Sequence, residues 1–245
     1  MSEAQDYYIP PEWLRAVAGK AFFYPCAGSD IAEPLSIFAP FMDELWFADI
    51  HYPTGMRMPR AFPRADHQDY TLTNISVDGA PSAQMERRGG HRFLPPSRRV
   101  ETYMRLDGSG FRVVRRRGFG EIGLGTEFPD RSIGVFFYRG DSRGEGGSGV
   151  QFFSNRWRRY EPLSNLFSLL CRKLTVPALI VTDGSNTRPR QRLPISQFAH
   201  GPISSAEAFK LCAGRDWIAD GLRWTCVGFV GRSYGPTLVW AVAPV

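Results

Sequence analysis

The sequence predicts an α/β protein with a mostly parallel sheet, helices on both faces and an antiparallel hairpin at the end. Short apolar runs alternate with helix-like segments along most of the chain, and such alternation indicates parallel strands joined by crossover helices in three layers. The last two apolar runs, 223–230 and 237–243, follow one another across a short turn with no helix between them. They therefore add an antiparallel strand to the expected sheet.

The expected helices have apolar residues three or four positions apart, as one buried helix face requires. In the second of them, Ile31, Leu35 and Phe38 have this spacing, and Pro40 indicates an early end. Pro10 and Pro11 suit the start of the first helix. The helices predicted in this way are 7–18, 31–42, 164–174 and 206–213.

The expected strands are apolar runs bounded by Gly, Pro, Asp or Ser. One pair of runs is joined by Asp107-Gly108, a dipeptide typical of a tight hairpin turn. The strands predicted in this way are 22–24, 44–50, 70–77, 100–106, 111–117, 132–138, 178–182, 223–230 and 237–243.

Length and composition predict one domain. The chain has 245 residues, 43% hydrophobic and 22% charged, which is ordinary for a globular protein with a sizeable core. We find no internal repeat and no sign of a second domain, so residues 1–245 are expected to form a single domain. Residues 51–99, rich in Pro, Arg, Gly and Asp, form a long irregular insertion in it.

Cysteine spacing and hydropathy predict a cytoplasmic protein. The four cysteines form no C-x-x-C pair, so free thiols in a reducing compartment are expected. The four histidines lack the spacing of a metal site. No apolar run approaches the roughly 18 to 20 residues of a membrane span, and the polar start at 1–6 does not resemble a signal peptide. We therefore expect neither a membrane partner nor a bound metal.

The most informative stretch is 21–30, followed by an acid at Asp49. A strand ends in a turn of small residues, a helix follows, and the next strand ends in a carboxylate about 20 residues further on, which is the layout of a nucleotide-type pocket in a Rossmann-like sheet. Backbone amides of the turn approach a ligand, while Asp49 accepts hydrogen bonds from ribose hydroxyls. Because Asp30 repels phosphate, a methionine-type cofactor, or no cofactor, suits the site better than a dinucleotide.

The run Tyr24-Pro25-Cys26-Ala27-Gly28-Ser29-Asp30 resembles the D-P-F-A-G-S-G turn of amino-methylating DNA methyltransferases. More broadly, 20–50 and 130–245 resemble class I S-adenosylmethionine-dependent methyltransferases, a seven-stranded Rossmann-like family with a C-terminal antiparallel hairpin. The turn differs at both ends, where Tyr24 and Asp30 replace Asp and Gly, and the D-P-P-Y catalytic motif is absent.

The resemblance implies S-adenosylmethionine as the cofactor and a methyltransferase of unknown acceptor. It maps the ribose-binding acid onto Asp49 and the catalytic loop onto 139–142. In the glycine-rich loop that follows, Asp141 or Glu145 is the candidate general base. The residues assigned to the cofactor are Tyr24, Pro25, Cys26, Ala27, Gly28, Ser29, Asp30, Asp49, Ile50 and Arg139.

Two other functions stay open. Tyr24 in place of the family's acid favours a catalytically silent scaffold or regulator. The net charge of +6 and the arginine clusters favour a nucleic-acid-binding module, because arginines interleaved with aromatic rings clamp phosphates and stack on bases. These clusters are Arg87-Arg88, Arg98-Arg99, Arg115-Arg116-Arg117, and Arg156 with Arg158-Arg159, among which Trp157 and Tyr160 are interleaved. The oligomeric state is not indicated.

Each site also has a plainer structural interpretation. The turn 26–30 reads equally as a capped start of a helix, with Asp30 as its N-cap. Asp49 reads as a solvated acid, and the loop 140–149 as an exposed surface loop. The segment 183–186 follows another predicted strand, and it either lines the same crevice at the carboxyl edge of the sheet or is an ordinary turn.

Overall fold

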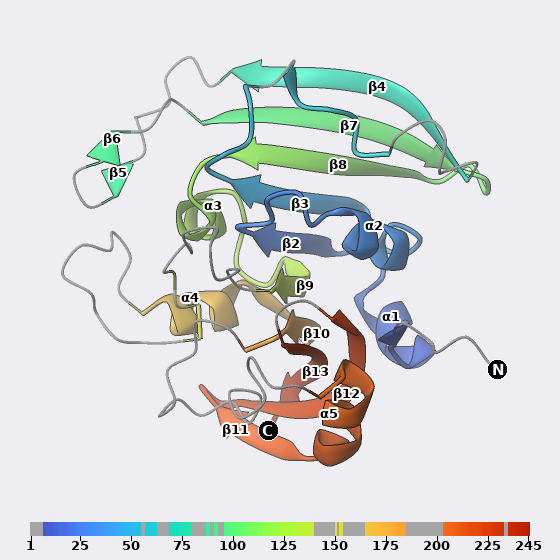
Figure 1. Cartoon of the computed structure of the whole chain (residues 1–245), viewed down its shortest axis with the longest axis vertical. Coiled ribbons are helices and arrows are strands. Elements are labelled where there is room, and N and C mark those ends of the chain that lie inside the picture. Colours follow the sequence, from blue (N-terminus) through green and yellow to red (C-terminus); the bar gives the residue numbers. More distant parts are fainter. Residues whose placement is uncertain are drawn as a thin grey trace. The chain divides into compact units, whose positions relative to one another are not determined.

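The computed structural model describes residues 7–54, 57–62, 69–79, 87–88, 91–92, 96–139, 150, 152–153, 165–184, 203–232 and 235–245. Contacts divide the chain into two compact units, whose elements are labelled in Figure 1. The terminal unit comprises 1–17, 130–156 and 165–245, and the inner unit comprises 18–129 and 157–164. We describe each unit by itself.

The terminal unit contains a sheet in the order β1-β12-β13-β10-β9, with β11 paired to β12. Here β9 and β10 are parallel, whereas the other strand pairs described in this unit are antiparallel. Every residue of β9 is buried, as its unbroken apolar sequence requires. Its elements are β1 (Tyr7–Tyr8), α1 (Pro11–Val17), β9 (Ile133–Tyr138), α4 (Leu166–Lys173), β10 (Leu174–Thr182), α5 (Ser205–Cys212), β11 (Asp216–Ala219), β12 (Leu222–Arg232) and β13 (Pro236–Pro244).

The inner unit contains a sheet in the order β2-β3-β8-β7-β4 and a separate ribbon of β5 and β6. The pairs β2–β3 and β3–β8 are parallel, whereas β7 is antiparallel to both β8 and β4. Its elements are β2 (Ala21–Pro25), α2 (Ala32–Phe38), β3 (Glu44–Asp49), β4 (Tyr70–Gly79), β5 (Arg87–Arg88), β6 (His91–Arg92), β7 (Ser97–Arg105), β8 (Gly110–Arg117) and α3 (Gly120–Thr126).

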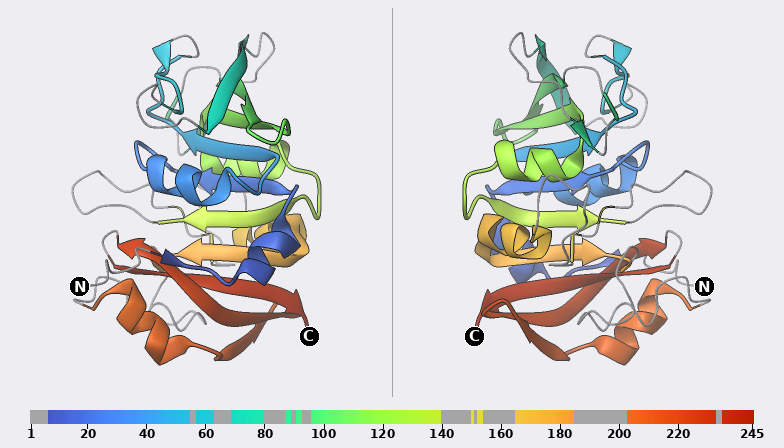
Figure 2. Two further views of the ribbon diagram at one scale, coloured as in Figure 1. Left: turned by 90° about the vertical axis from the view of Figure 1, so that its right-hand side faces the viewer. Right: turned by 90° about the vertical axis from the view of Figure 1, so that its left-hand side faces the viewer.

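The two helices of the inner unit cover opposite faces of its sheet. Successive residues of a strand point to opposite faces: Phe22 packs on Phe38 of α2 with ring centroids 5.2 Å apart, whereas Phe23 packs on Phe128, just beyond α3, at 4.8 Å. Figure 2 shows α2 and α3 on the two sides of β2 and β3. We call these the α2 face and the α3 face.

The predicted three-layer, mostly parallel Rossmann-like fold is wrong. In the units as described, parallel pairing is limited to β2–β3, β3–β8 and β9–β10, and antiparallel pairing dominates. The five described helices have only seven or eight residues each. The prediction took alternation to mean helical crossovers. Between β3 and β8, however, the chain builds strands β4 and β7, and β7 is antiparallel to both β4 and β8. No crossover helix is needed between antiparallel neighbours, and β7 and β8 are joined by a short turn.

Many single elements were nevertheless predicted correctly. The hairpin around Asp107-Gly108 is confirmed, since β7 and β8 pair up to Met104 opposite Gly110. The closing strands β12 and β13 are also an antiparallel pair. Helix α3 was missed because 118–125 holds four glycines, which disfavour helix. The single methyltransferase-like domain over 1–245 stays a prediction, and its insertion at 51–99 contains β4, β5, β6 and the start of β7.

Candidate functional site

The predicted turn lies at the carboxyl end of β2, beside the end of β3. The two strands are in parallel register up to Pro25 opposite Ala48, so both chains leave the sheet at the same edge. The backbone then turns through left-handed conformations at Cys26 (φ 58°) and Gly28 (φ 52°). This region costs glycine little, but it is rare and strained for a residue such as Cys26.

The carboxylate of Asp49 holds this turn. Its Oδ2 accepts a hydrogen bond from the Gly28 amide at 2.9 Å, and its Oδ1 accepts one from the His51 amide at 2.7 Å. A carboxylate has about four lone-pair positions, so each oxygen retains one for another donor. The structure therefore brings the predicted turn and the predicted acid together, and it gives Asp49 a structural task as well.

Tyr24 and Asp30, the two positions at which the turn departs from the family pattern, contact one another. The Tyr24 hydroxyl donates a hydrogen bond to Asp30 Oδ2 at 2.8 Å. Asp30 is not the N-cap of α2: that position is Ile31, and no side chain caps the helix there. The prediction that Asp30 is the N-cap is therefore wrong, whereas the interpretation of 26–30 as a turn between a strand and a helix without a ligand stays open.

The remaining predicted site residues have different positions. Ala27 is buried, and its amide donates to the Ala48 carbonyl at 3.0 Å, whereas Ser29 is exposed and Ile50 directly follows Asp49. Arg139 directly follows β9 in the terminal unit, where its guanidinium lies 5.1 Å from the centre of the Phe137 ring. The candidate bases Asp141 and Glu145 lie outside the described residues, so their role stays a prediction.

Sequence reasoning missed Tyr52, three residues after Asp49. Its hydroxyl oxygen is buried and has no hydrogen-bond partner among the residues that the structure describes. Burial raises the pKa of the Tyr52 phenol, and the charge of Asp49 raises it further, with smaller effects from Arg115, which lowers it, and from Asp30 and Cys26. The phenol is therefore a neutral donor. The signal was a tyrosine just beyond a strand-end acid, in a segment interpreted as irregular.

A buried ionic cluster lies on the α2 face of β7 and β8. Arg99, Glu101 and Tyr103 alternate along β7 and so share one face, and Arg99 lies directly opposite Arg115 of β8. Glu101 Oε1 contacts Arg99 Nε at 2.5 Å and Arg115 Nη2 at 2.6 Å. Its Oε2 accepts from the Tyr103 hydroxyl and, at 2.9 Å, from the Ala61 amide.

In this cluster, the hydrogen bonds to Glu101 and the nearby positive charge lower its pKa by more than burial raises it. Burial alone raises the pKa of Glu101, but hydrogen bonds from Tyr103, the Ala61 amide and Arg99, together with the charge of Arg115, bring it below its ordinary value. Burial lowers the pKa of Arg115 against the opposing effect of Glu101. A carboxylate with four donors is thus ionised inside the protein, as buried charges require.

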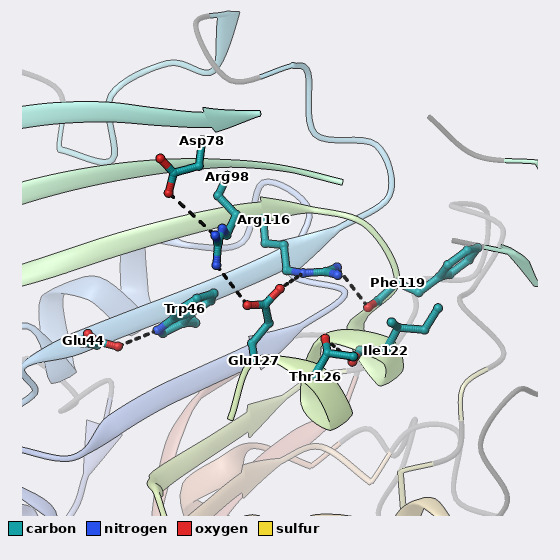
Figure 3. Close-up of polar contacts among 9 residues, drawn as sticks. All are labelled: Glu44, Trp46, Asp78, Arg98, Arg116, Phe119, Ile122, Thr126 and Glu127. Carbon is teal, nitrogen blue, oxygen red and sulfur yellow. Dashed lines mark hydrogen bonds and ion pairs between the residues drawn. The ribbon is translucent and has the colours of Figure 1, made fainter. Parts of the chain in front are cut away.

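A second set of ion pairs lies on the α3 face, shown in Figure 3. Glu127 Oε1 accepts from Arg116 Nε at 2.9 Å, and Glu127 Oε2 accepts from Arg98 Nη1 at 3.1 Å. Arg98 also lies 3.7 Å from the carboxylate of Asp78, and Arg116 donates to the Phe119 carbonyl at 3.5 Å. Glu127, which directly follows α3, therefore pairs with one arginine of β7 and one of β8.

These contacts bear on the predicted nucleic-acid surface. Arg98, Arg99, Arg115 and Arg116 all contact acids of the inner unit, and the last three are buried. Arg99, Arg115 and Arg116 therefore serve the interior of this unit, whereas the side chain of Arg98 is 38% exposed. The cluster around Trp157, with Arg156, Arg158, Arg159 and Tyr160, lies outside the described residues, and of Arg87-Arg88 the structure describes only the strand β5.

Comparisons with known proteins find no family model, no curated protein and no solved structure that matches this chain. The resemblance to methyltransferases therefore stays a prediction. The described residues hold no group of three or more His, Cys, Asp or Glu arranged to hold a metal ion. All four cysteines are free thiols. Among the helices that the structure describes, none is long and apolar enough to cross a membrane.

Proposed function

We propose that this protein binds S-adenosylmethionine at the carboxyl ends of β2 and β3 and acts as a methyltransferase. The observation that supports this is the hydrogen bond from the Gly28 amide to Asp49, which joins a left-handed turn and a strand-end carboxylate at one edge of parallel strands. In this arrangement Asp49 has one free lone pair on each oxygen for a ribose hydroxyl.

The charge of this edge suits a cationic ligand. Asp30 and Asp49 lie on or beside the turn, where Tyr24 and two backbone amides donate to them. Two carboxylates repel phosphate groups and attract a sulfonium or ammonium group. S-adenosylmethionine carries both of these cations, whereas dinucleotides and ATP are anionic.

Methyl transfer depends mainly on alignment of the acceptor with the sulfonium carbon, so few catalytic side chains are needed. Asp141 or Glu145 stays the candidate general base that deprotonates the methyl acceptor. Neither residue indicates the chemical class of that acceptor.

A second candidate is a catalytically silent scaffold of the same fold. Each oxygen of Asp49 already binds a backbone amide, and Asp49 is only 8% exposed. An acid used in this way stabilises a turn whether or not a ligand binds.

Thermal unfolding with S-adenosylmethionine and S-adenosylhomocysteine separates the two candidates, with NAD and ATP as controls. A ligand at about 100 times its Kd adds roughly 2.7 kcal/mol to the unfolding free energy, which raises Tm by about 2–4 °C per kcal/mol in a chain of this size. Under the proposal, only the two adenosyl ligands raise Tm.

The variant Asp49→Asn tests the assignment of the acid, and Asp43→Asn, in an exposed residue just before β3, is the matched control. We expect Asp49→Asn to abolish the shift and Asp43→Asn to retain it. A shift that survives Asp49→Asn excludes the ribose role of Asp49. No shift with any nucleotide favours the silent scaffold.

A further inference from the structure

The hydroxyl of Tyr52 is a buried donor without a partner. Its Oη has no hydrogen bond among the described residues, although buried hydroxyls are nearly always hydrogen-bonded. Such an omission persists in a folded protein where water or a ligand supplies the missing partner. Tyr52 lies beside the proposed site, because it follows Asp49 by three residues and His51, between them, donates its amide to Asp49. A ligand of that site is therefore a candidate for the missing partner.

A second unpartnered donor belongs to the same region. Arg115 is 3% exposed, and its Nε has no partner among the described residues, although its Nη2 binds Glu101. Arg115 Nη2 also donates to the Pro59 carbonyl, in the segment that follows Tyr52, and Tyr52 and Arg115 each affect the pKa of the other. Two buried donors therefore lie beside the proposed site, and Asp49 is the charged group with the largest effect on the pKa of Tyr52.

The donors and acceptors around Tyr52 select the chemistry of a ligand. A carboxylate or phosphate accepts from Tyr52 but is repelled by Asp49 and Asp30. An ammonium group binds these acids but has no lone pair for the phenol. A hydroxyl group does both, since it donates to a free lone pair of Asp49 and accepts from Tyr52.

We infer that Tyr52 is a ligand-binding residue and that its hydroxyl, together with Asp49, holds a hydroxyl group of the ligand, as a ribose diol offers. Arg115 Nε then donates to the neighbouring hydroxyl of the same diol. This inference rests on the proposed function, and it names a residue that sets the preference for ribose over deoxyribose.

The test compares Tyr52→Phe with wild type for binding of adenosine, 2′-deoxyadenosine and 3′-deoxyadenosine by calorimetry. We expect Tyr52→Phe to weaken adenosine binding about 3- to 10-fold, the effect of one neutral hydrogen bond. The same variant leaves unchanged the affinity for the deoxy form that lacks the bound hydroxyl. We expect no fall in Tm of the ligand-free protein, because the hydroxyl has no hydrogen-bond partner among the residues that the structure describes.

Tyr103→Phe is the matched control. Its hydroxyl donates to Glu101, so we expect a lower Tm and the same ratio of affinities for adenosine and its deoxy forms.

Three outcomes overturn the inference, and they differ from one another. If Tyr52→Phe weakens binding of adenosine and both deoxy forms equally, or weakens none of them, Tyr52 does not contact the ligand. The proposed function is not affected by that result. A fall in Tm as large as that of Tyr103→Phe means that the phenol has a partner within the protein. If wild type binds neither S-adenosylmethionine nor adenosine at millimolar concentration, the proposed function fails and the inference fails with it.

Discussion

The amide nitrogen of Gly28 lies 2.9 Å from Oδ2 of Asp49. This bond connects the turn after β2 to the last residue of β3, and it explains how a left-handed turn at Cys26 and Gly28 stays in one conformation. The conformation of the candidate site therefore depends on the same carboxylate that is proposed to bind the ligand, so stability and binding must be measured separately.

Replacing Asp49 destabilises the protein even without ligand. Asp49→Ala leaves the Gly28 and His51 amides without their acceptor. Both bonds are part-buried, so we expect a loss at the lower end of the about 1–3 kcal/mol that an unsatisfied buried donor costs. Asp49→Asn retains one acceptor oxygen and has a smaller effect. Urea unfolding measures both, with Asp43→Ala as the control in an exposed acid just before β3. Equal unfolding free energies for Asp49→Ala and Asp43→Ala would contradict the structural role of Asp49.

Two glycines of α3 respond in opposite ways to alanine. A Cβ at Gly120 would lie 2.4 Å from Pro25 Cβ and 3.0 Å from Pro25 Cα, whereas a Cβ at Gly123 meets nothing nearer than Arg116 Cδ at 3.6 Å. We expect Gly120→Ala to lose about 1–3 kcal/mol through overpacking, and Gly123→Ala to gain roughly 0.5–1 kcal/mol from helix propensity.

Thermal unfolding of these two variants provides the measurement. Because Pro25 directly precedes Cys26, Gly120→Ala also displaces the candidate site. We therefore expect Gly120→Ala, but not Gly123→Ala, to lower the affinity for an adenosyl ligand. Equal Tm values for the two variants would show that α3 does not pack closely on the end of β2.

The ionised Glu101 makes stability depend on pH. Its pKa in the folded protein is lowered from 4.5, so near and below that value the unfolded chain binds more protons than the folded one. The stabilisation by Glu101 is complete above its unfolded pKa, and it is lost as the pH falls through the folded pKa. Wild-type Tm therefore declines on acidification through this window.

Glu101→Gln removes this contribution and leaves Arg99 and Arg115 without their anion. Breaking a buried ion pair costs about 3–5 kcal/mol, so we expect a lower Tm at pH 7 and a flatter dependence of Tm on pH below about 4.5. Glu12→Gln, in an exposed residue of α1, is the control. A Glu101→Gln curve parallel to that of wild type would show that Glu101 is not ionised in the interior.

Local patterns predicted much of this chain because their causes are local. Asp107-Gly108 specifies a hairpin turn wherever it lies, and the spacing of Gly28 and Asp49 follows from one strand–helix–strand unit. Whether neighbouring strands are parallel or antiparallel depends on how the chain connects them. The apolar runs alone do not contain this information. For this reason the antiparallel strand β7 was predicted and the fold around it was not.

The arginines show the same limit. Arg98 and Arg116 read as a solvated basic surface because their partner, Glu127, follows a helix that four glycines concealed. The alternation of Arg99, Glu101 and Tyr103 was visible in the sequence. Its burial depends on Ala61 and its neighbours covering that face, which no pattern within β7 reveals.

Thiol labelling tests the candidate site independently of any enzyme assay. Burial raises the pKa of Cys226 to about 12, and that of Cys171 to about 12 with a further contribution from Asp220; burial also raises the pKa of Cys212. Since the thiolate is the reactive form, these three thiols react slowly in the folded protein. Cys26 is partly exposed in a left-handed turn, and we expect it to give the one fast phase with a disulfide reagent at pH 8.

Cys26→Ser removes this fast phase, whereas Cys212→Ser retains it. If S-adenosylhomocysteine binds along the turn, it slows the labelling of Cys26 in wild type and does not do so in Asp49→Asn. Slowing that persists in Asp49→Asn would place the ligand near Cys26 without using the carboxylate. A fast phase that survives Cys26→Ser would mean that another thiol is reactive: partly exposed Cys171 of α4, or one of the buried Cys212 of α5 and Cys226 of β12.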